Sequence, residues 1–466
     1  MYILKELSFQ PNKAKGKNII VSGENLQAMA ALHKYKGQVD LIVTDPPYNT
    51  GKDFRYNDKY TNWAEFMQPR LQMMKQMLKE NGVLAICIDD RELFCLGMLL
   101  NEVFGEENRI GIINWQKAYS PKNDSRHLSS ATEYILVYAK NKEKAKTNLP
   151  DRTNSMNSKY KNPDNDPKGP WASDNPCASR ITPKDRYAIQ SPFSGALHYP
   201  GAGSWRYPKK SMKMHLEAWG SKYTEQDIKD GRAKALVIKG AQIPPIPTGQ
   251  SLNNNPIVPS SVQEDEVIKM SEKKAIIISD TKPIPIIHFL KSGYGRPRIK
   301  RYLADVKQGK VPLTYWANDN YDELFRLGSQ SWPYEESGHS QTGINELDYI
   351  VGKGHNLKTV KPIKLIQKVI QLWCPGGGIV FDPFAGSGTV GHAVIELNEI
   401  SNSNRSFILV EKGETGDEYA KTLTRERIKR AITGERIGKD GIARVLEPPI
   451  VNGFEFWEAI ATPIFQ

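Results

Sequence analysis

Short apolar runs alternate with amphipathic stretches over the first 140 residues. Residues 19–21 and 39–43 are rich in Ile and Val and read as strands, and a continuous apolar run occupies residues 83–88. Apolar residues recur at helical spacing over 26–32 and 63–79. Continuous apolar strands are typical of a parallel sheet covered on both faces, and their alternation with helices predicts a doubly wound α/β sheet.

The same alternation returns after about residue 355. Pro362 suits the first turn of a helix. The apolar stripe of that helix comprises Ile363, Ile366, Ile370 and Trp373. A strand at 379–381, a helix at 390–397 and a strand at 407–410 follow. This segment predicts one half of the doubly wound sheet, and the N-terminal segment supplies the other half.

Composition changes between the two halves. Residues 141–170 are polar and proline-containing, and residues 171–312 are irregular, with a Pro/Asn/Ser-rich stretch at 240–261 that we interpret as a flexible hairpin. The predicted organisation is therefore one sheet interrupted by an insertion. Its four parts are a first half at 1–140, an insertion at 141–312, a second half at 313–440 and a C-terminal extension at 441–466.

The overall composition is that of a globular protein, with 39% hydrophobic and 25% charged residues among 466. The net charge of +12 favours a polyanionic partner without proving one. The four cysteines form no C-x-x-C pair, which removes the common zinc pattern and suits a reducing compartment. Neither a signal peptide nor an apolar run of membrane-spanning length is apparent, so we expect a cytoplasmic protein without membrane contact.

A tetrapeptide, Asp45-Pro46-Pro47-Tyr48, follows the predicted strand at 39–43. The exocyclic amine of adenine or cytosine is a poor nucleophile because its lone pair is delocalised into the ring. The Asp45 carboxylate and a backbone carbonyl held by Pro46 can accept its two N–H hydrogens and aim the lone pair at a methyl donor. Tyr48 offers a flat face to an extruded base, and Pro47 fixes the turn. The alternative is an ordinary Pro-Pro turn with a surface aspartate.

A second motif spans 382–389 (DPFAGSGT), between a predicted strand and a predicted helix. Gly386 and Gly388 permit a tight turn, and the helix N-terminus offers N–H groups to a carboxylate. Asp382 can pair with an ammonium group. Glu411 follows 23 residues after Gly388, the spacing of the acid that binds ribose hydroxyls in dinucleotide folds. These features fit S-adenosylmethionine (SAM); a βα turn with a chance acid is the alternative.

Together the motifs resemble those of the β-class DNA amino-methyltransferases, in which the catalytic tetrapeptide precedes the target-recognition region and the SAM-binding turn follows it. More closely, the chain is similar to the modification (Mod) subunits of type III restriction–modification systems. The resemblance covers about 18–440 and is weaker in the middle. The matching stretches are 22–26 (SGENL), 45–51 (DPPYNTG), 132–136 (TEYIL), 300–303 (KRYL), 361–362 (KP) and 384–389 (FAGSGT).

The resemblance implies a Rossmann-like SAM-dependent methyltransferase sheet with an inserted target-recognition domain, and a tetrapeptide that holds the target base. The implied cofactor-binding positions are Asp382, Phe384, Gly386, Gly388, Glu411, Glu24 and Lys361. Among these, Glu411 takes the ribose, and Lys361 opens the helix that flanks the cofactor. Glu24 stands where the family usually has Asp, near the cofactor adenine. Glu24 and Lys361 can equally be charged residues at helix starts.

Two basic stretches of the insertion, at 203–214 and 291–301, are candidates for DNA binding. Each combines lysines and arginines with at least one aromatic residue. Basic side chains bind phosphates, and aromatic side chains stack on bases or insert between them. The alternative is that each stretch is an ordinary solvated face. The predicted DNA-binding residues are Trp205, Arg206, Lys209, Lys210, Arg296, Arg298 and Lys300.

The expected activity is site-specific transfer of a methyl group from SAM to adenine N6 in duplex DNA, by base flipping and direct transfer, without a metal. In the family an Asp at the first tetrapeptide position favours adenine. N4-cytosine methylation is the nearest alternative, and a catalytically inactive DNA-binding subunit of a restriction or defence complex is the non-enzymatic one. The expected partners are double-stranded DNA, a second copy of the chain and a separate restriction or defence subunit.

Other methyl transfers fit the sequence less well. Methylation at cytosine C5 needs a nucleophilic cysteine, and Cys177 lies in an Asn/Pro/Ser-rich loop instead. Enzymes that methylate RNA or a protein glutamine with a related tetrapeptide usually place the SAM turn before it, the reverse of the order here. No Walker A sequence is present, so any cleavage activity belongs to a separate chain.

Overall fold

The computed structural model describes residues 2–6, 18–52, 57–118, 127–150, 152, 154–246, 256–258, 265–281, 283–316, 340–413, 418–438, 440–450 and 452–461. The chain forms two compact units. One comprises residues 1–150 and 309–466, and the other comprises residues 151–308. The sequence pattern had suggested boundaries at 140 and 312.

A mixed sheet forms the centre of the first unit, with the strand order β1-β21-β2-β18-β17-β3-β4-β6-β5-β16. Neighbours from β21 to β4 run parallel, whereas β6 is antiparallel to both β4 and β5. The strands are β1 Tyr2–Glu6, β2 Ile19–Ser22, β3 Val39–Thr44, β4 Leu78–Ile88, β5 Arg109–Gln116, β6 Thr132–Ala139, β16 Tyr315–Trp316, β17 Gly377–Asp382, β18 Asn404–Glu411 and β21 Glu455–Ala461. The predicted doubly wound α/β sheet is confirmed.

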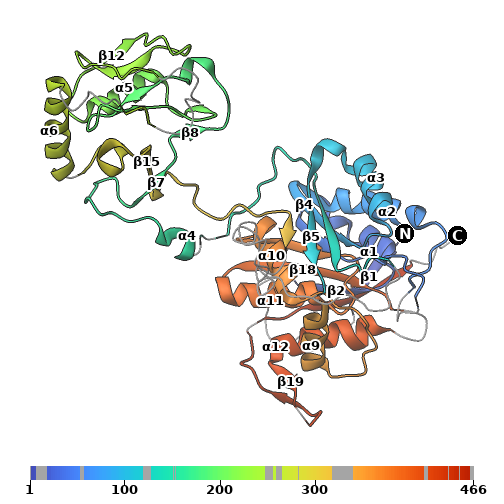
Figure 1. Cartoon of the computed structure of the whole chain (residues 1–466). Coiled ribbons are helices and arrows are strands. Elements are labelled where there is room, and N and C mark those ends of the chain that lie inside the picture. Colours follow the sequence, from blue (N-terminus) through green and yellow to red (C-terminus); the bar gives the residue numbers. More distant parts are fainter. Residues whose placement is uncertain are drawn as a thin grey trace. The chain divides into compact units, whose positions relative to one another are not determined.

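Helices cover both faces of this sheet (Figure 1). One face carries α1 Asn25–Ala31, α2 Trp63–Met77 and α3 Leu93–Phe104, and the other carries α10 Ile363–Trp373, α11 Thr389–Ser401 and α12 Arg425–Thr433. The unit also holds α9 Ser340–Val351 and the hairpin of β19 Glu435–Ile437 and β20 Ala443–Val445. The predicted stripe of α10 is buried in full, so periodicity identified the face that packs on the sheet.

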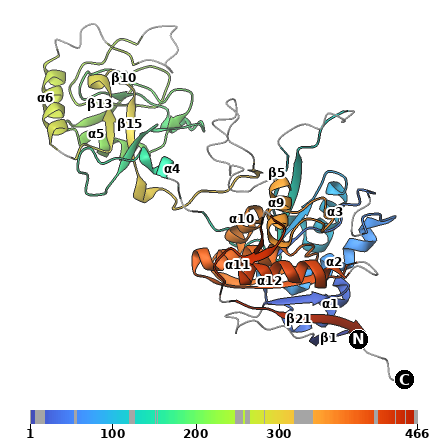
Figure 2. The ribbon, with the colours of Figure 1, turned by 90° about the horizontal axis from the view of Figure 1, so that it is seen from below.

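The C-terminal strand lies inside the sheet and corrects the predicted extension at 441–466. β21 pairs with β2 in parallel and with β1 in antiparallel fashion (Figure 2). Phe456 on β21 is 1% exposed and belongs to the main core. Strand pairing between residues more than 400 positions apart leaves no local signal, which explains why the sequence pattern missed it.

The strand order reverses direction between β17 and β3. From β17 the chain passes through α11 to β18 on one side, and from β3 it passes through α2 to β4 on the other side. In doubly wound sheets, ligands bind at such a switch point, beyond the carboxyl ends of the strands. Asp382 ends β17 and Asp45 directly follows β3, so both predicted motifs lie at this point.

The second unit contains short strands around two small apolar clusters. Its elements are α4 Asn154–Ser158, β7 Trp171–Asp174, β8 Cys177–Ala178, β9 Ile189–Gln190, β10 Leu197–His198, β11 Ser204–Trp205, α5 Lys209–Glu217, β12 Tyr223–Gln226, β13 Ala235–Ile238, α6 Glu266–Asp280, β14 Ile287–Phe289 and β15 Pro297–Tyr302. Strands of two to six residues explain why the sequence looked irregular here. Within the predicted hairpin at 240–261, residues 247–255 and 259–261 lie outside the described residues. None of the helices that the structure describes is long and apolar enough to cross a membrane.

Candidate active site

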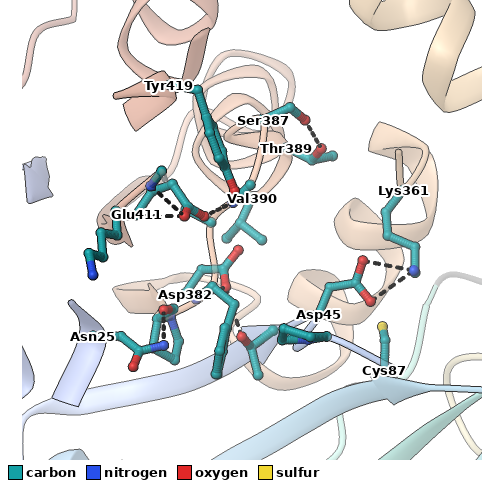
Figure 3. Close-up of a pocket in the computed structure, with 18 of the residues that line it drawn as sticks. Asn25, Asp45, Cys87, Lys361, Asp382, Ser387, Thr389, Val390, Glu411 and Tyr419 are labelled. Atoms are coloured by element: carbon teal, nitrogen blue, oxygen red, sulfur yellow. Dashed lines mark hydrogen bonds and ion pairs between the residues drawn. The ribbon is translucent and has the colours of Figure 1, made fainter. Parts of the chain in front are cut away.

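A pocket of about 540 Å³ opens at the switch point of the sheet (Figure 3). Segments that follow β2, β3, β17 and β18 line it, together with the residues that lead into α10. From the two predicted motifs it receives Asp45, Pro47, Asp382 and the turn 383–387. A single pocket therefore joins motifs that lie more than 300 residues apart in the chain.

Asp45 lies at the centre of a cluster of charged and polar side chains. Lys361 Nζ lies 2.9 Å from Asp45 Oδ1 and 2.8 Å from Oδ2, and the Tyr48 hydroxyl donates to Oδ1 at 2.6 Å. Lys361 also contacts the Tyr48 hydroxyl at 2.9 Å and Glu133 Oε2 at 3.1 Å. Lys117 pairs with the other oxygen of Glu133 at 3.2 Å. Figure 3 shows the Lys361 ammonium facing the Asp45 carboxylate.

The charges of this cluster stabilise one another. Burial favours a neutral Lys361, but the neighbouring Asp45 and Glu133 raise the pKa of its ammonium. Burial also opposes ionisation of Glu133, but Lys361 and Lys117 lower the pKa of that carboxyl. Burial, followed by the charge of Asp45, raises the pKa of the Tyr48 hydroxyl. These directions favour an ionised Glu133, a protonated Lys361 and a neutral Tyr48 hydroxyl.

The loop after the tetrapeptide is held by side chains that the motif did not include. The Trp63 indole N–H donates to the Pro47 carbonyl at 2.8 Å. The Asp58 carboxylate is 2% exposed and accepts from the backbone N–H groups of Asn49 at 2.9 Å and Thr50 at 2.8 Å. Asn49 itself has a φ of 57°, a left-handed conformation that Asn tolerates better than most residues. These contacts fix the direction in which the tetrapeptide leaves β3.

Asp382 joins the two motifs at the base of the pocket. Its carboxylate accepts from the Thr44 hydroxyl at 2.9 Å and from the Phe384 backbone N–H at 3.1 Å. Burial, followed in smaller measure by the charges of Asp45 and Glu411, raises the pKa of Asp382 to about 8. A buried carboxyl that faces a pocket is well suited to a cationic ligand group, because a cation would restore its ordinary ionisation.

The glycine-rich turn adopts the conformation that its sequence predicts. Gly386 and Gly388 have φ angles of 52° and 83°, in the left-handed region that favours glycine. Glu411 Oε2 accepts from the Gly386 N–H at 2.6 Å, which attaches the end of β18 to the turn. Burial raises the pKa of the Glu411 carboxyl although several backbone N–H groups oppose it. Tyr419, which the sequence had not indicated, lines the same end of the pocket.

Glu24 both caps a helix and lines the pocket. Its side chain accepts from the Gln27 N–H at the start of α1 and forms an ion pair with Arg70 of α2. The Arg70 guanidinium lies 3.7 Å from the centroid of the Phe66 ring. The ring centroids of Phe66 and Phe384 are 6.2 Å apart. The predicted Phe384 is therefore part of an aromatic wall, to which α2 adds residues that no motif indicated.

A buried arginine that does not line the pocket supports the glycine-rich turn. Arg427 on α12 is 0% exposed and donates to the Ser387 hydroxyl at 2.7 Å and the Thr389 hydroxyl at 2.8 Å. Burial lowers the pKa of Arg427 to about 10, although the charges of Glu346 and Glu396 act in the opposite direction. A lone arginine on an amphipathic helix carries no sequence signal of this role.

Two of the predicted DNA-binding residues lie in the interior of the second unit. Trp205 is 2% exposed, and its indole N–H donates to the Tyr187 carbonyl at 2.8 Å. The Lys300 side chain is 0% exposed and pairs with Asp164 at 2.5 Å and Asp166 at 2.6 Å. Neither side chain can reach a DNA surface from these positions, so both predictions are corrected. The physical reason is burial, which a basic or aromatic residue in an irregular segment does not reveal.

The other candidates remain on the surface or at its margin. Arg206, Lys210 and Arg296 are exposed, and Lys209 and Arg298 are partly exposed. The unit has 26 lysines and arginines against 15 aspartates and glutamates, and thus carries nearly all of the net charge of the chain. Among the described residues, no group of three or more His, Cys, Asp and Glu side chains has a metal-binding arrangement.

Comparison with known proteins places these features in context. The chain is 26% identical over 456 residues to the Mod subunit of the type III restriction–modification enzyme StyLTI of Salmonella typhimurium, covering 89% of this chain and 56% of that protein. It is also 26% identical to the Mod subunit of the type III restriction–modification enzyme EcoP15I of Escherichia coli, covering 91% of this chain and 64% of that protein. The chain thus spans roughly half to two-thirds of the length of these relatives.

A type II methyltransferase, M.KpnI of Klebsiella pneumoniae, is 25% identical, covering 88% of this chain and 83% of that protein. Among solved structures, the M1.HpyAVI–SAM complex is 14% identical with a TM-score of 0.34, covering 88% of this chain and 99% of that chain. A similarity of that size carries no argument about the site. The model of the DNA methylase family matches residues 39–422, from β3 to the segment before α12, and so includes both motifs. This chain belongs to the N6/N4 DNA methylase family.

Proposed function

We propose that this chain transfers a methyl group from SAM to the N6 amine of adenine in double-stranded DNA. The observation that carries the proposal is the shared pocket of Asp45 and Asp382, which lie at the carboxyl ends of adjacent parallel strands and are linked through Thr44. One carboxylate is suited to an amine that will be methylated, and the other to the ammonium group of the methyl donor. Family membership and the relatives named above support the same activity.

The pocket residues fit SAM by their chemistry. A volume of about 540 Å³ lies within the usual range for ligand pockets. In this proposal Asp382 pairs with the methionine ammonium, Glu411 accepts from the ribose hydroxyls, and Phe384 contacts the adenine. When bound, SAM supplies a methyl group made electrophilic by its sulfonium. In this proposal Glu24 lies near the adenine, where its ion pair holds the Arg70 side chain in place.

The tetrapeptide acts on the extruded base. The Asp45 carboxylate accepts one N–H of the target amine, and a carbonyl of the Pro46-Pro47 segment accepts the other. The Trp63 indole already occupies the Pro47 carbonyl, which leaves the Pro46 carbonyl as the second acceptor in this proposal. Two such hydrogen bonds direct the nitrogen lone pair away from the ring plane. The methyl group is then transferred directly, without a covalent enzyme intermediate, and the surplus proton of the product amine leaves towards the carboxylate.

The second unit binds DNA in this proposal, through Arg206, Lys209, Lys210, Arg296 and Arg298. Its excess of basic residues supports contact with phosphates. Two relatives are named as Mod subunits of restriction–modification enzymes, so we include a separate restriction subunit and a second copy of this chain among the proposed partners.

The activity can be tested by expressing the chain in a host without DNA methylation and analysing hydrolysed DNA by mass spectrometry. We expect N6-methyladenine with the wild-type chain and none with Asp45→Ala. N4-methylcytosine would instead identify cytosine as the target. DNA that stays unmodified in the presence of folded, SAM-binding protein would leave the DNA-binding subunit as the better interpretation.

A further inference from the structure

Lys361 contacts the catalytic tetrapeptide, a position that the resemblance did not imply. It immediately precedes Pro362, the N-cap residue of α10, so the start of that helix determines where its side chain begins. The lysine side chain is 10% exposed, and its ammonium lies within 3.1 Å of Asp45, Tyr48 and Glu133. The ammonium thus lies between two carboxylates, beside the group that accepts the target amine in the proposed function.

Counting hydrogen bonds shows what this contact leaves open at Asp45. A carboxylate has about four acceptor directions, two on each oxygen. Tyr48 donates to Oδ1, and the Lys361 ammonium, which shares its three N–H hydrogens among Asp45, Tyr48 and Glu133, contacts both Oδ1 and Oδ2. Among the described residues these donors use three directions, and the remaining direction is on Oδ2. The Asp45 side chain is 39% exposed and lines the pocket, so there is room beside the carboxylate for one further donor.

Glu133 supplies the second anchor of the lysine. It lies on β6, its side chain is 8% exposed, and its other oxygen is paired with Lys117. Because Glu133 and Asp45 hold the ammonium from two sides, Lys361 cannot turn away from Asp45 without giving up a buried ion pair. Lys361 lies in the segment before α10, Glu133 lies on β6 and Asp45 directly follows β3, so the geometry depends on the folded sheet.

We propose that Lys361 is a positioning residue which, anchored by Glu133, orients the Asp45 carboxylate and leaves one acceptor direction of Oδ2 for the target amine. This inference rests on the proposed function and assigns roles to Lys361 and Glu133 within it. It predicts that the lysine acts on the chemical step through Asp45 and leaves SAM binding unchanged.

The first test compares Lys361→Met with Lys364→Met, the same change at an exposed lysine of α10. We expect kcat on unmethylated genomic DNA to fall about 100-fold for Lys361→Met, as when one preorganised donor is removed, and to stay unchanged for Lys364→Met. The Kd of SAM, measured by calorimetry, stays at the wild-type value in both. Glu133→Gln lowers kcat in the same direction by a smaller factor.

Chemical rescue separates positioning from a general loss of structure. Lys361→Ala leaves space for a small cation, so added ethylammonium restores part of kcat in a saturable manner. An unchanged kcat in Lys361→Met overturns the proposal. A weaker affinity for SAM, with kcat restored at saturating SAM, overturns it as well, because the lysine would then serve the cofactor.

Acetylation of lysines, followed by mass spectrometry, tests the contact without any methyl transfer. We expect Lys361 to be protected in the wild type and to react in Asp45→Ala, while Lys364 reacts in both. If Lys361 reacts as fast as Lys364 in the wild type, this proposal fails even when the protein methylates DNA. If Lys361 is protected through Asp45 but the wild type methylates no DNA, the proposed function fails, and with it the catalytic role assigned to this contact.

Discussion

Burial changes the chemistry of Asp382 more than any neighbouring charge does. The Asp382 residue is 3% exposed, and the groups that donate to its carboxyl are neutral: the Thr44 hydroxyl and the Phe384 backbone N–H. Its folded-state pKa of about 8 lies above the ordinary value of 3.8. The stability that this group contributes is therefore present below pH 3.8 and is lost as the pH rises through about 8. A cationic ligand that pairs with the carboxylate offsets that loss.

We accordingly expect the affinity for SAM to increase between pH 5.5 and 7.5. Over this range the free carboxyl is mostly protonated and must release a proton to bind the ammonium, so the binding constant rises by up to about tenfold per pH unit. Calorimetry in buffers of different ionisation enthalpy measures both the affinity and the proton release. Asp382→Asn is the control: we expect it to bind SAM more weakly, with an affinity that does not change with pH. A flat profile for the wild type would contradict the assignment of Asp382 to the ammonium.

At the scale of elements, the loop after β3 is held by a carboxylate that lies outside the tetrapeptide. The Asp58 carboxylate accepts hydrogen bonds from the N–H groups of two consecutive residues, Asn49 and Thr50. The indole N–H of Trp63, on α2, donates to the Pro47 carbonyl. The tetrapeptide is thus fixed from the loop and from the following helix. The geometry of the tetrapeptide therefore depends also on residues that follow it in the chain, the more distant of these two being Trp63, 16 residues after Pro47.

Replacing Asp58 with Asn tests this dependence. One acceptor oxygen becomes an NH2 group that faces a backbone N–H, so we expect the loop to loosen and kcat for DNA methylation to fall about 10- to 100-fold, corresponding to roughly 1–3 kcal/mol. The Kd of SAM should stay unchanged, since Asp58 does not line the pocket. The exposed Asp90→Asn serves as the matched control. Equal activity of both variants would show that the loop is held without Asp58.

Helix α12 supports the glycine-rich turn through Arg427. Replacing this arginine with Met removes the guanidinium that donates to the Ser387 and Thr389 hydroxyls and takes away the buried positive charge beside Glu346 and Glu396. We expect a loss of about 3–5 kcal/mol in the free energy of unfolding, as for other broken buried charge networks, together with weaker SAM binding. Urea denaturation measures the first effect. Lys429→Met, on the same helix but partly exposed, should change the midpoint little. An equal midpoint for both variants would count against the role of Arg427.

At the scale of the whole molecule, the second unit is an insertion whose two ends meet in the first unit. The chain leaves at Pro150 and returns at Gly309, and the Lys310 N–H donates to the Pro150 carbonyl at 2.7 Å. The strands, helices and pocket of the methylase sheet belong to the first unit alone. The pocket and most of the basic charge therefore belong to different units.

Excising residues 151–308 and joining the ends with a short Gly/Ser linker should therefore leave a folded protein. We expect this variant to bind SAM with the wild-type Kd and to lose binding to DNA at 150 mM salt, because it lacks most of the basic excess. Calorimetry measures the first property and fluorescence anisotropy with duplex DNA the second. Retained DNA affinity with the wild-type salt dependence would show that phosphate contacts lie on the first unit instead.

Much of the architecture could be predicted because its signals are local. Apolar periodicity gave β2, β3, α2, α10, β17, α11 and β18 within a few residues, and turn chemistry identified the left-handed turn residues Gly386 and Gly388. The second unit escaped prediction because strands of two to six residues are too short for periodicity to appear. The basic candidates there were chosen by residue type, and burial then separated Trp205 and Lys300 from those that remain at the surface.

The sequence by itself determined which residues could perform the chemistry, since the tetrapeptide, the glycine-rich turn and Glu411 each owe their character to a few neighbouring positions. Only the tertiary structure decided what these residues contact. It joined Thr44 to Asp382 across 338 positions, placed Lys361 against Asp45, and inserted β21 into the sheet. Contacts of that kind arise from strand pairing and burial, which depend on the packing of the whole chain and leave no mark on the local pattern.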